Sequence, residues 1–206
     1  MTAAQGMFTE AQLECAVVEL FAQQGYMPVD GDTLDRTHRD ILIEEDLRAF
    51  LAVRYPDLTA TEMQTAVNQL RLIPAAPLYA GNRAAHRLVT EGFDLVREDA
   101  ARVALHVDFI DWEDTARNVF RVVRQFSVED RALRRPDLLL FVNGIPVTIL
   151  ELKSAVRADA TIYDAWAQIT ARYVRDIPRL LRYTFLAVIS DGVNTRMGSI
   201  FTPYAF

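Results

Sequence analysis

Residues 137–153, Asp137-Leu-Leu-Leu-Phe-Val-Asn-Gly-Ile-Pro-Val-Thr-Ile-Leu-Glu-Leu-Lys153, decide the fold. The segment contains two apolar runs joined by Asn143-Gly144, which is the strongest short signal for a β-hairpin in the chain. Because both runs are apolar on both faces, the sequence predicts a hairpin that is central in a sheet and covered on both sides.

The length of the hairpin loop decides which acidic side chains meet. A strict two-residue loop pairs residues whose numbers sum to 287, which places Asp137 opposite Leu150 and turns Glu151 to the other face. A three-residue connection or a one-residue bulge raises this sum to 288 and places Asp137 opposite Glu151. We predict the second register, in which Lys153 shares one face with both acids.

Lys153 is the only lysine among the 22 basic residues of the chain. Arginine cannot replace lysine where a compact, mobile cation must touch a reacting oxygen or water. With Asp137 and Glu151, Lys153 forms a D-x13-E-x-K pattern that is expected of a metal-dependent phosphodiesterase. The alternative is an ordinary cross-strand ion pair, which is disfavoured because burying three charges gives little net stabilisation.

The pattern on both sides of the hairpin predicts the other core elements. Thr9 and Gln12 form a capping-box signal for a helix over 9–24. Alternating or apolar stretches predict strands at 103–109, 120–128 and 184–190. A helix is predicted at 159–176, before the last of these strands. The strand, helix, strand order implies a right-handed crossover to a parallel strand. The fold class is therefore α/β, with a core order of helix, three strands, helix, strand and a mixed central sheet flanked by helices.

Residues 38–91 are predicted to form a helical annex. It is inserted between the first core helix at 9–24 and the sheet core at 100–206 of a single domain. Helices are expected at 38–54 and 60–73, followed by a short helix that Asn82 caps and Gly92 ends.

Composition limits the classes of protein. The chain has 206 residues and 51% hydrophobic residues, enough for a substantial core. The single Cys15 excludes an internal disulfide and suits a reducing compartment. Without a membrane-length apolar run or a secretory signal, we expect a cytoplasmic protein with no membrane contact.

Charge is distributed unevenly along the chain. Residues 1–100 contain 8 arginines against 16 acidic residues, whereas residues 101–206 contain 14 basic against 12 acidic residues. Arginines near the hairpin could contact DNA phosphates or bridge to surface acids; the candidates for DNA binding are Arg134, Arg135, Arg172 and Arg175.

Glu14 occupies an unusual place in the first helix. On the helical wheel it lies between Val18 and Phe21, inside the apolar arc. A carboxylate in that position needs a partner or a metal ion unless it reaches the edge of the apolar stripe. Both interpretations remain open from the wheel alone.

Three motifs carry a resemblance to a known family: Arg135-Pro136-Asp137, Phe141-Val142-Asn143-Gly144-Ile145-Pro146 and Glu151-Leu152-Lys153. Together with Ser190-Asp191-Gly192 and the order of elements, they resemble the N-terminal nuclease domain of the motor-restriction (R) subunit of type I restriction enzymes, in the PD-(D/E)XK nuclease superfamily. The resemblance covers nearly the whole chain.

The resemblance implies a metal site. Asp137 and Glu151 would bind the ion, and the backbone carbonyl of Leu152 would be a further ligand. Lys153 would orient or polarise the attacking water and offset phosphate charge. Hard oxygen ligands suit Mg²⁺, with Mn²⁺ as a substitute, and either one or two ions are compatible with the sequence.

The resemblance adds three helix residues to the catalytic candidates. Glu14 matches the first-helix acid that completes many such sites. Gln168 and Tyr173 resemble a Gln…Tyr helix motif, but they are five residues apart where the usual spacing is four. Five residues of an α-helix rotate through roughly 140°, so both side chains need not face one ligand.

The resemblance also implies partners. The expected ones are double-stranded DNA and, through the full-length R subunit, the methylation and specificity subunits of a restriction complex. The chain lacks a phosphate-binding G-x-x-x-x-G-K-[S/T] loop, so it is expected to be an excised domain with ATP bound only in the missing motor region. The function implied is Mg²⁺-dependent DNA cleavage without sequence specificity. The alternatives are a nuclease-fold DNA- or subunit-binding module that does not cleave, or a structure-specific repair nuclease.

Overall fold

A computed structural model describes residues 9–153 and 161–204. Its centre is a six-stranded mixed sheet flanked by helices, as the α/β prediction requires. In spatial order the strands are β1 (Met27–Asp30), β4 (Phe120–Arg124), β7 (Leu138–Val142), β8 (Ile145–Leu152), β9 (Leu186–Ser190) and β10 (Thr195–Gly198). β1 runs parallel to β4 and β8 parallel to β9, whereas the other neighbours are antiparallel.

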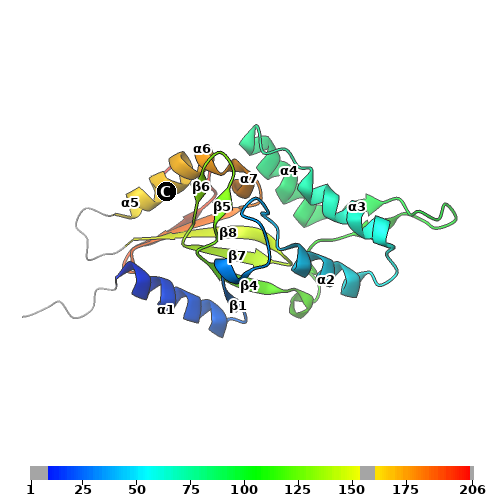
Figure 1. Cartoon of the computed structure of the whole chain (residues 1–206), viewed down its shortest axis with the longest axis horizontal. Coiled ribbons are helices and arrows are strands. Elements are labelled where there is room, and N and C mark those ends of the chain that lie inside the picture. The colour runs from blue at the N-terminus through cyan, green and yellow to red at the C-terminus, as the bar shows by residue number, and fades with distance from the viewer. Residues whose placement is uncertain (1–8, 154–160, 205–206) are drawn as a thin grey trace, which may run out of the picture.

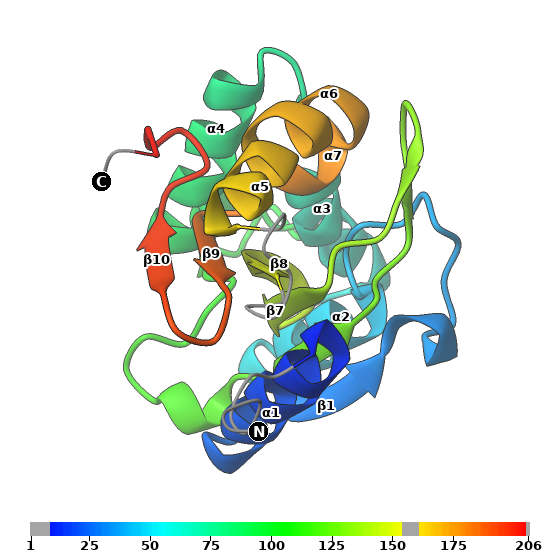
Figure 2. The same ribbon diagram turned by 90° about the vertical axis from the view of Figure 1, so that its left-hand side faces the viewer.

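Helices cover both faces of this sheet, as Figure 1 and Figure 2 show. One face is covered by α1 (Glu10–Gln23), and the other by the consecutive segments α5 (Ile162–Ala167), the π-helix η3 (Gln168–Tyr173), α6 (Val174–Asp176) and α7 (Pro178–Leu181). Alternate side chains of β7 divide between the faces: Leu138 packs with Leu13 of α1, and Leu139 belongs to the cluster that contains Ile169. The predicted order of helix, three strands, helix and strand is found in α1, β4, β7, β8, the α5–α7 segment and β9, but the sheet contains two further strands, β1 and β10.

The β7–β8 hairpin combines a tight turn with a bulge. Asn143 and Gly144 both have positive φ, 48° and 78°, so the loop is a two-residue turn. Beside the turn Phe141 pairs with Pro146, but further along Leu140 pairs with Thr148, and Val147 is the extra residue. The pairing then continues to Leu138 opposite Leu150, so the predicted bulged register is confirmed.

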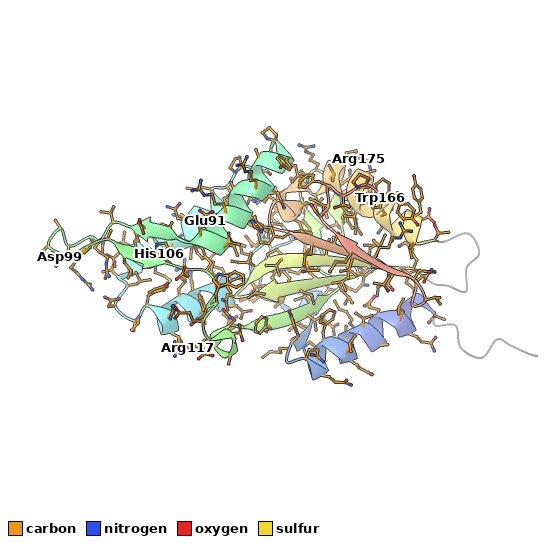
Figure 3. All side chains as sticks on the ribbon, turned by 180° about the vertical axis from the view of Figure 1, so that it is seen from behind. Glu91, Asp99, His106, Arg117, Trp166 and Arg175 are labelled. Carbon is orange, nitrogen blue, oxygen red and sulfur yellow. The ribbon has the colours of Figure 1, made fainter. Side chains whose placement is uncertain are left out.

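The annex forms one end of the molecule. Its helices are α2 (Glu44–Arg54), α3 (Ala60–Arg71) and α4 (Leu78–Glu91), followed by a hairpin of β2 (Phe93–Leu95) and β3 (Leu105–Val107). Figure 3 places Asp99 and His106 at this end and Trp166 and Arg175 at the opposite end. Buried annex residues such as Leu47 and Val67 belong to the same apolar cluster as Leu139 and Ile149, so the annex and the sheet share one core.

Smaller elements complete the chain. They are the 3₁₀ turns η1 (Gly31–Thr33) and η2 (Thr115–Arg117) and the hairpin of β5 (Val128–Glu129) with β6 (Leu133–Arg134). No helix in the described part of the chain is long and apolar enough to cross a membrane.

The turn of the central hairpin is buried beneath the annex. The backbone N–H of Ile43 donates to the carbonyl of Gly144 at 2.9 Å, and a Cβ on Gly144 would lie 2.1 Å from the Ile43 oxygen. The Asn143 side chain donates to the Phe109 carbonyl at 2.9 Å and accepts from the Val119 N–H at 2.7 Å. Glycine is therefore required here by close backbone approach as well as by its positive φ.

Several predicted boundaries in the annex are wrong. Helix α2 begins at Glu44 rather than at 38, because Arg36 holds the preceding loop through the Thr37 and Asp40 carbonyls. Helix α4 begins at Leu78. Asn82 is consequently inside the helix, where its amide donates to carbonyls of the 181–184 segment instead of capping.

The strand predictions also need correction. The strand expected at 103–109 is reduced to β3, which pairs only with β2, and the strand expected at 120–128 breaks at Gln125, whose φ is 53°. The last strand begins at Leu186 rather than at 184. The sequence did not predict β1 or β10, and residues 159–160 of the expected helix lie outside the described residues.

Candidate functional site

The open end of the hairpin brings two buried carboxylates together. Asp137 directly precedes β7 and Glu151 lies in β8, so the bulged register continues to place them opposite each other. Asp137 Oδ2 accepts a hydrogen bond from the backbone N–H of Leu152 at 2.7 Å. Only 9% of Asp137 and 1% of Glu151 is exposed, so both acids are largely removed from water.

Lys153 lies next to this pair. Its Nζ is 3.2 Å from Glu151 Oε1, and its side chain is 13% exposed. Its backbone N–H donates to the Ser190 carbonyl at 2.9 Å, which continues the parallel pairing of β8 with β9. The predicted acid, acid, lysine group is thus assembled at one end of the central strands.

Gln168 and Tyr173 converge on the same carboxylate. The Tyr173 hydroxyl donates to Glu151 Oε2 at 3.1 Å, the Gln168 amide donates to Glu151 Oε1, and that amide is 2.7 Å from the Tyr173 hydroxyl. The two residues bound the π-helix η3, in which hydrogen bonds run from i to i+5, so five residues make about one turn. The rotation of roughly 140° assumed α-helical geometry, whereas the π-helix turns both candidate side chains toward one carboxylate.

Two buried carboxylates share one nearby cation, the Lys153 ammonium. Burial and, to a lesser extent, the neighbouring charge of Asp137 together raise the pKa of Glu151 to about 8. Burial likewise raises the pKa of Asp137 to about 6, although the Leu152 amide and Lys153 act in the opposite direction. A divalent cation would offset this deficit and favour the ionised forms of both acids.

The donor set fits a hard cation. Asp137 and Glu151 offer carboxylate oxygens, and no group of three or more acidic, histidine or cysteine side chains suited to metal binding occurs in residues 9–153 and 161–204. Mg²⁺ is commonly held by one or two carboxylates, with water and substrate phosphate completing its shell. Two carboxylates are within the number that such an ion uses.

Glu14 lies beside the carboxylate pair without joining it. It projects from α1, on the face opposite η3, and its half-buried side chain accepts from the Gln125 amide at 2.9 Å. Its charge is nevertheless one cause of the raised pKa of Asp137. The helical wheel left two interpretations, a partnered carboxylate and a carboxylate at the edge of the apolar stripe. Glu14 combines them, because it is half-buried and accepts from Gln125.

Gln125 was missed by sequence reasoning. Besides donating to Glu14, it donates its backbone N–H to the Asp137 carbonyl at 2.9 Å. Its φ of 53° is unusual for a residue other than glycine. The only available signal was the break in alternation between Val122 and Phe126, which marks an interrupted strand.

The four candidate DNA-binding arginines differ in their surroundings. Arg134 and Arg175 both pair with Asp176, at 2.6 Å each, which also lowers the pKa of Asp176 to about 2. Arg135 and Arg172 are exposed and make no ion pair with another described residue. The bridging alternative thus applies to the first two, and only the second two present uncompensated charge to solvent.

The fold and the site together define a class of protein. A mixed sheet flanked by helices, with two acids and a lysine at the end of its central hairpin, is consistent with an α/β nuclease-like domain. Residues 7–206 match the family model described as the type I restriction enzyme R protein N terminus. The chain belongs to this family.

Curated relatives agree with the family match. The chain is 27% identical over 174 residues to the type I restriction enzyme HindI endonuclease subunit of Haemophilus influenzae, with 80% of the chain and 16% of that protein covered. It is 27% identical over 212 aligned residues to the SsaAORF53P endonuclease subunit of Staphylococcus saprophyticus, with 96% and 20% covered. It is 29% identical over 194 residues to the SauMSSORF170P endonuclease subunit of Staphylococcus aureus, with 91% and 19% covered. The chain thus spans less than a quarter of each of these relatives.

Proposed function

We propose that this chain is the DNA-cleaving domain of a type I restriction enzyme R subunit, with a PD-(D/E)XK core that hydrolyses phosphodiester bonds in the presence of Mg²⁺. The observation that carries the proposal is the meeting of Asp137, Glu151 and Lys153 at one end of the central hairpin. Family membership and the names of the relatives support DNA cleavage as the reaction.

The two acids and the Leu152 carbonyl would hold the cation. When bound, Mg²⁺ supplies a Lewis acid that stabilises charge on the phosphate and lowers the pKa of water. Gln168 and Tyr173 each donate to one oxygen of Glu151, so they fix the orientation of that carboxylate.

Lys153 is the group that contacts the reacting atoms. Its ammonium donates hydrogen bonds to the attacking water or to a non-bridging phosphate oxygen, and its charge offsets the charge that develops there. The attacking water gives up one proton to solvent as its oxygen forms a new bond to phosphorus. The bond to the leaving sugar oxygen breaks, and that oxygen takes up a proton from solvent. Nothing in this reaction requires contact with the bases, in keeping with cleavage that is not sequence-specific.

The remaining expectations concern the whole assembly. We infer that double-stranded DNA reaches this domain within a complex of R, methylation and specificity subunits, and that ATP is bound by the motor region of the R subunit. Exposed Arg135 and Arg172 are the favoured phosphate contacts of the domain itself. Such an assembly would act in the cytoplasm.

A metal-binding experiment tests the proposal directly. Mn²⁺ binding is measured by electron paramagnetic resonance, with a short DNA duplex present, for the wild-type chain, Asp137→Ala and the control Glu113→Ala, which removes an exposed acid elsewhere. We expect binding in the wild type and the control and its loss in Asp137→Ala. Absence of binding in all three would favour the alternative function, a nuclease-fold module that binds DNA or a subunit without cleaving.

A further inference from the structure

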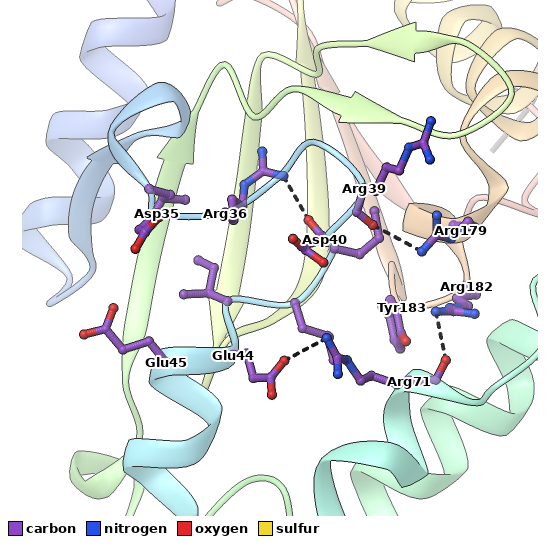
Figure 4. A pocket seen from close by; sticks show the side chains of 14 residues that line it. Asp35, Arg36, Arg39, Asp40, Glu44, Glu45, Arg71, Arg179, Arg182 and Tyr183 are labelled. Atoms are coloured by element: carbon purple, nitrogen blue, oxygen red, sulfur yellow. Dashed lines mark hydrogen bonds and ion pairs between the residues drawn. The ribbon is translucent and has the colours of Figure 1, made fainter. Parts of the chain in front are cut away.

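A second polar site lies outside the carboxylate site. It is a cavity of about 450 Å³ between the loop at 34–45, the start of α2, the end of α3 and helix α7. Figure 4 shows Arg36 on the loop side and Arg179 and Arg182 on the α7 side. We call it the arginine cavity, and its size is in the range of small-molecule sites.

Three of its arginines have no carboxylate partner among the described residues. The Arg36 guanidinium donates to the carbonyls of Thr37, Asp40 and Ser127 at 3.1, 2.9 and 2.7 Å. Arg179 donates from its guanidinium to the Arg39 carbonyl at 3.2 Å. Backbone carbonyls satisfy some N–H groups of these side chains, and the Arg36 guanidinium also lies over the Phe126 ring at 3.4 Å, but none of these contacts supplies a paired negative charge.

Arg182 likewise has backbone carbonyls, and no carboxylate, as hydrogen-bond acceptors among the described residues. This side chain is 8% exposed, and its guanidinium donates to the Ile73 and Arg71 carbonyls. The Nε atoms of Arg36 and Arg182 are buried and have no hydrogen-bond acceptor. Burial also lowers the pKa of Arg36 to about 10, against the opposing effect of the Asp40 and Asp32 charges. A buried guanidinium without a carboxylate partner destabilises the folded chain unless an anion binds to it.

The described acids that line the cavity make no ion pair with Arg36, Arg179 or Arg182. Glu44 accepts from Arg48 at 2.6 Å and from Arg71 at 3.0 Å. Asp40 accepts from the backbone N–H and hydroxyl of Thr37 at 3.0 and 2.7 Å. Figure 4 places the remaining two, Asp35 and Glu45, on the side away from Arg179. The α7 side of the cavity is therefore its basic side.

We propose that the arginine cavity binds a phosphate group between Arg36 and the α7 pair Arg179 and Arg182. A phosphate supplies several acceptor oxygens and negative charge, which these guanidinium groups lack. Arg179 and Arg182 are three residues apart on one helical turn, a spacing that lets two side chains reach one ligand. The phosphate belongs either to a free phosphorylated molecule or to a nucleic-acid backbone.

Calorimetric titration with inorganic pyrophosphate, in EDTA, tests this site without involving the metal site. The variants are Arg179→Ala and the charge-matched control Arg87→Ala, which removes an exposed arginine of α4 that pairs with Glu91. We expect saturable binding in the wild type and in the control, and binding at least about tenfold weaker in Arg179→Ala, because a charge-assisted hydrogen bond is lost. Equal melting temperatures establish that the variants are folded, and Arg179→Gln replaces Arg179→Ala if the latter is not.

A second arm distinguishes the two sources of phosphate. A short DNA duplex is titrated under the same conditions. If pyrophosphate does not bind but DNA binding is weakened by Arg179→Ala and not by Arg87→Ala, the phosphate is that of a nucleic acid. If the Arg179 variants bind both ligands as the wild type does, or if Arg87→Ala loses as much, the proposal is wrong. Asp137→Ala should bind pyrophosphate normally, so failure here is separate from failure of the proposed catalytic function.

Discussion

Glu62 in the annex and Glu151 in the central hairpin are both buried, with 3% and 1% exposed, yet their pKa values are shifted in opposite directions. Glu62 accepts from the backbone N–H groups of Thr59 and Glu98 and from Arg97, and these hydrogen bonds lower its pKa to about 2. Burial and a second acid instead raise the pKa of Glu151 to about 8.

The difference separates a structural acid from a candidate functional one. The annex supplies every donor that Glu62 needs, so that charge is complete within the folded chain. Glu151 has Lys153, Gln168 and Tyr173 as donors but remains short of positive charge. Burial alone therefore does not identify a site, whereas burial with an uncompensated charge points to a ligand.

The largest expected effect is on catalysis. Lys153→Ala or Glu151→Gln should reduce DNA cleavage by the full restriction assembly at least about 100-fold, because a charge at the reacting phosphate is lost. Glu62→Gln should leave cleavage per folded molecule unchanged. Single-turnover cleavage of plasmid DNA measures both. Wild-type cleavage by a folded Lys153→Ala assembly would remove the central claim of the proposed function.

The free energy of unfolding should depend more on Glu62 than on Glu151, the reverse of the order expected for cleavage. Glu62→Gln breaks a buried pair and leaves Arg97, 3% exposed at its side chain, without its main partner. We expect its melting temperature at pH 8 to fall by roughly 5 °C or more. Glu151→Gln replaces an unfavourable buried charge by a neutral side chain of the same shape, so its melting temperature in EDTA should be unchanged or higher. A large loss of stability in Glu151→Gln would show that Glu151 is a structural acid like Glu62.

The pH dependence of stability should also differ. The folded-state pKa values of Asp137 and Glu151, about 6 and about 8, exceed the ordinary values near 4. The folded metal-free protein thus holds protons more tightly than the unfolded chain, and stability should fall as pH rises from about 4 to 8. Glu62, with a pKa of about 2, contributes stability that is lost as pH falls below about 4.

Melting curves in EDTA and in Mg²⁺ check this prediction. Mg²⁺ should raise the melting temperature more at pH 8 than at pH 5, because cation binding displaces protons from the carboxylates. Glu151→Gln should remove most of the decline between pH 5 and 8. Identical Mg²⁺ effects at both pH values would contradict the raised pKa values.

The smallest effect is expected at Gln125, which links Glu14 to the backbone of Asp137. Gln125→Asn keeps a side chain that tolerates positive φ but shortens the amide by one methylene, whereas Gln125→Gly removes the amide and relieves the backbone. Both should weaken Mn²⁺ binding a few-fold without unfolding the chain. If Asn weakens binding and Gly does not, the backbone matters and the link to Glu14 does not.

The catalytic candidates were predictable because they depend on local rules. The Asn143-Gly144 turn and the two-residue period of a β-strand were enough to place Glu151 opposite Asp137 once one bulge was allowed. The π-helix was not predictable, because no short-range signal distinguishes it from an α-helix in residues 162–176. Its presence changes which way Tyr173 faces.

Other details of the fold, in the sheet and in the annex, depended on distant contacts. The short β1 strand is mostly exposed and forms only by pairing with Phe120–Arg124, far along the chain. Asn82 has the residue type of a helix cap, yet it satisfies carbonyls of the 181–184 segment instead. Neither outcome can be read from neighbouring residues, because tertiary hydrogen bonds override local propensity there.

The buried turn of the central hairpin has a mechanical consequence. Gly144 is hydrogen-bonded to Ile43 and has no free space beside it, while the other end of the same strands bears Asp137 and Glu151. The hairpin is therefore fixed to the annex at its turn and carries the two carboxylates at its open end. We expect a displacement of α2 to move the turn with it and to shift β7 and β8 toward or away from the carboxylate site. The bulge at Val147 is the one irregularity in the described pairing of these two strands, so we expect the hairpin to bend there.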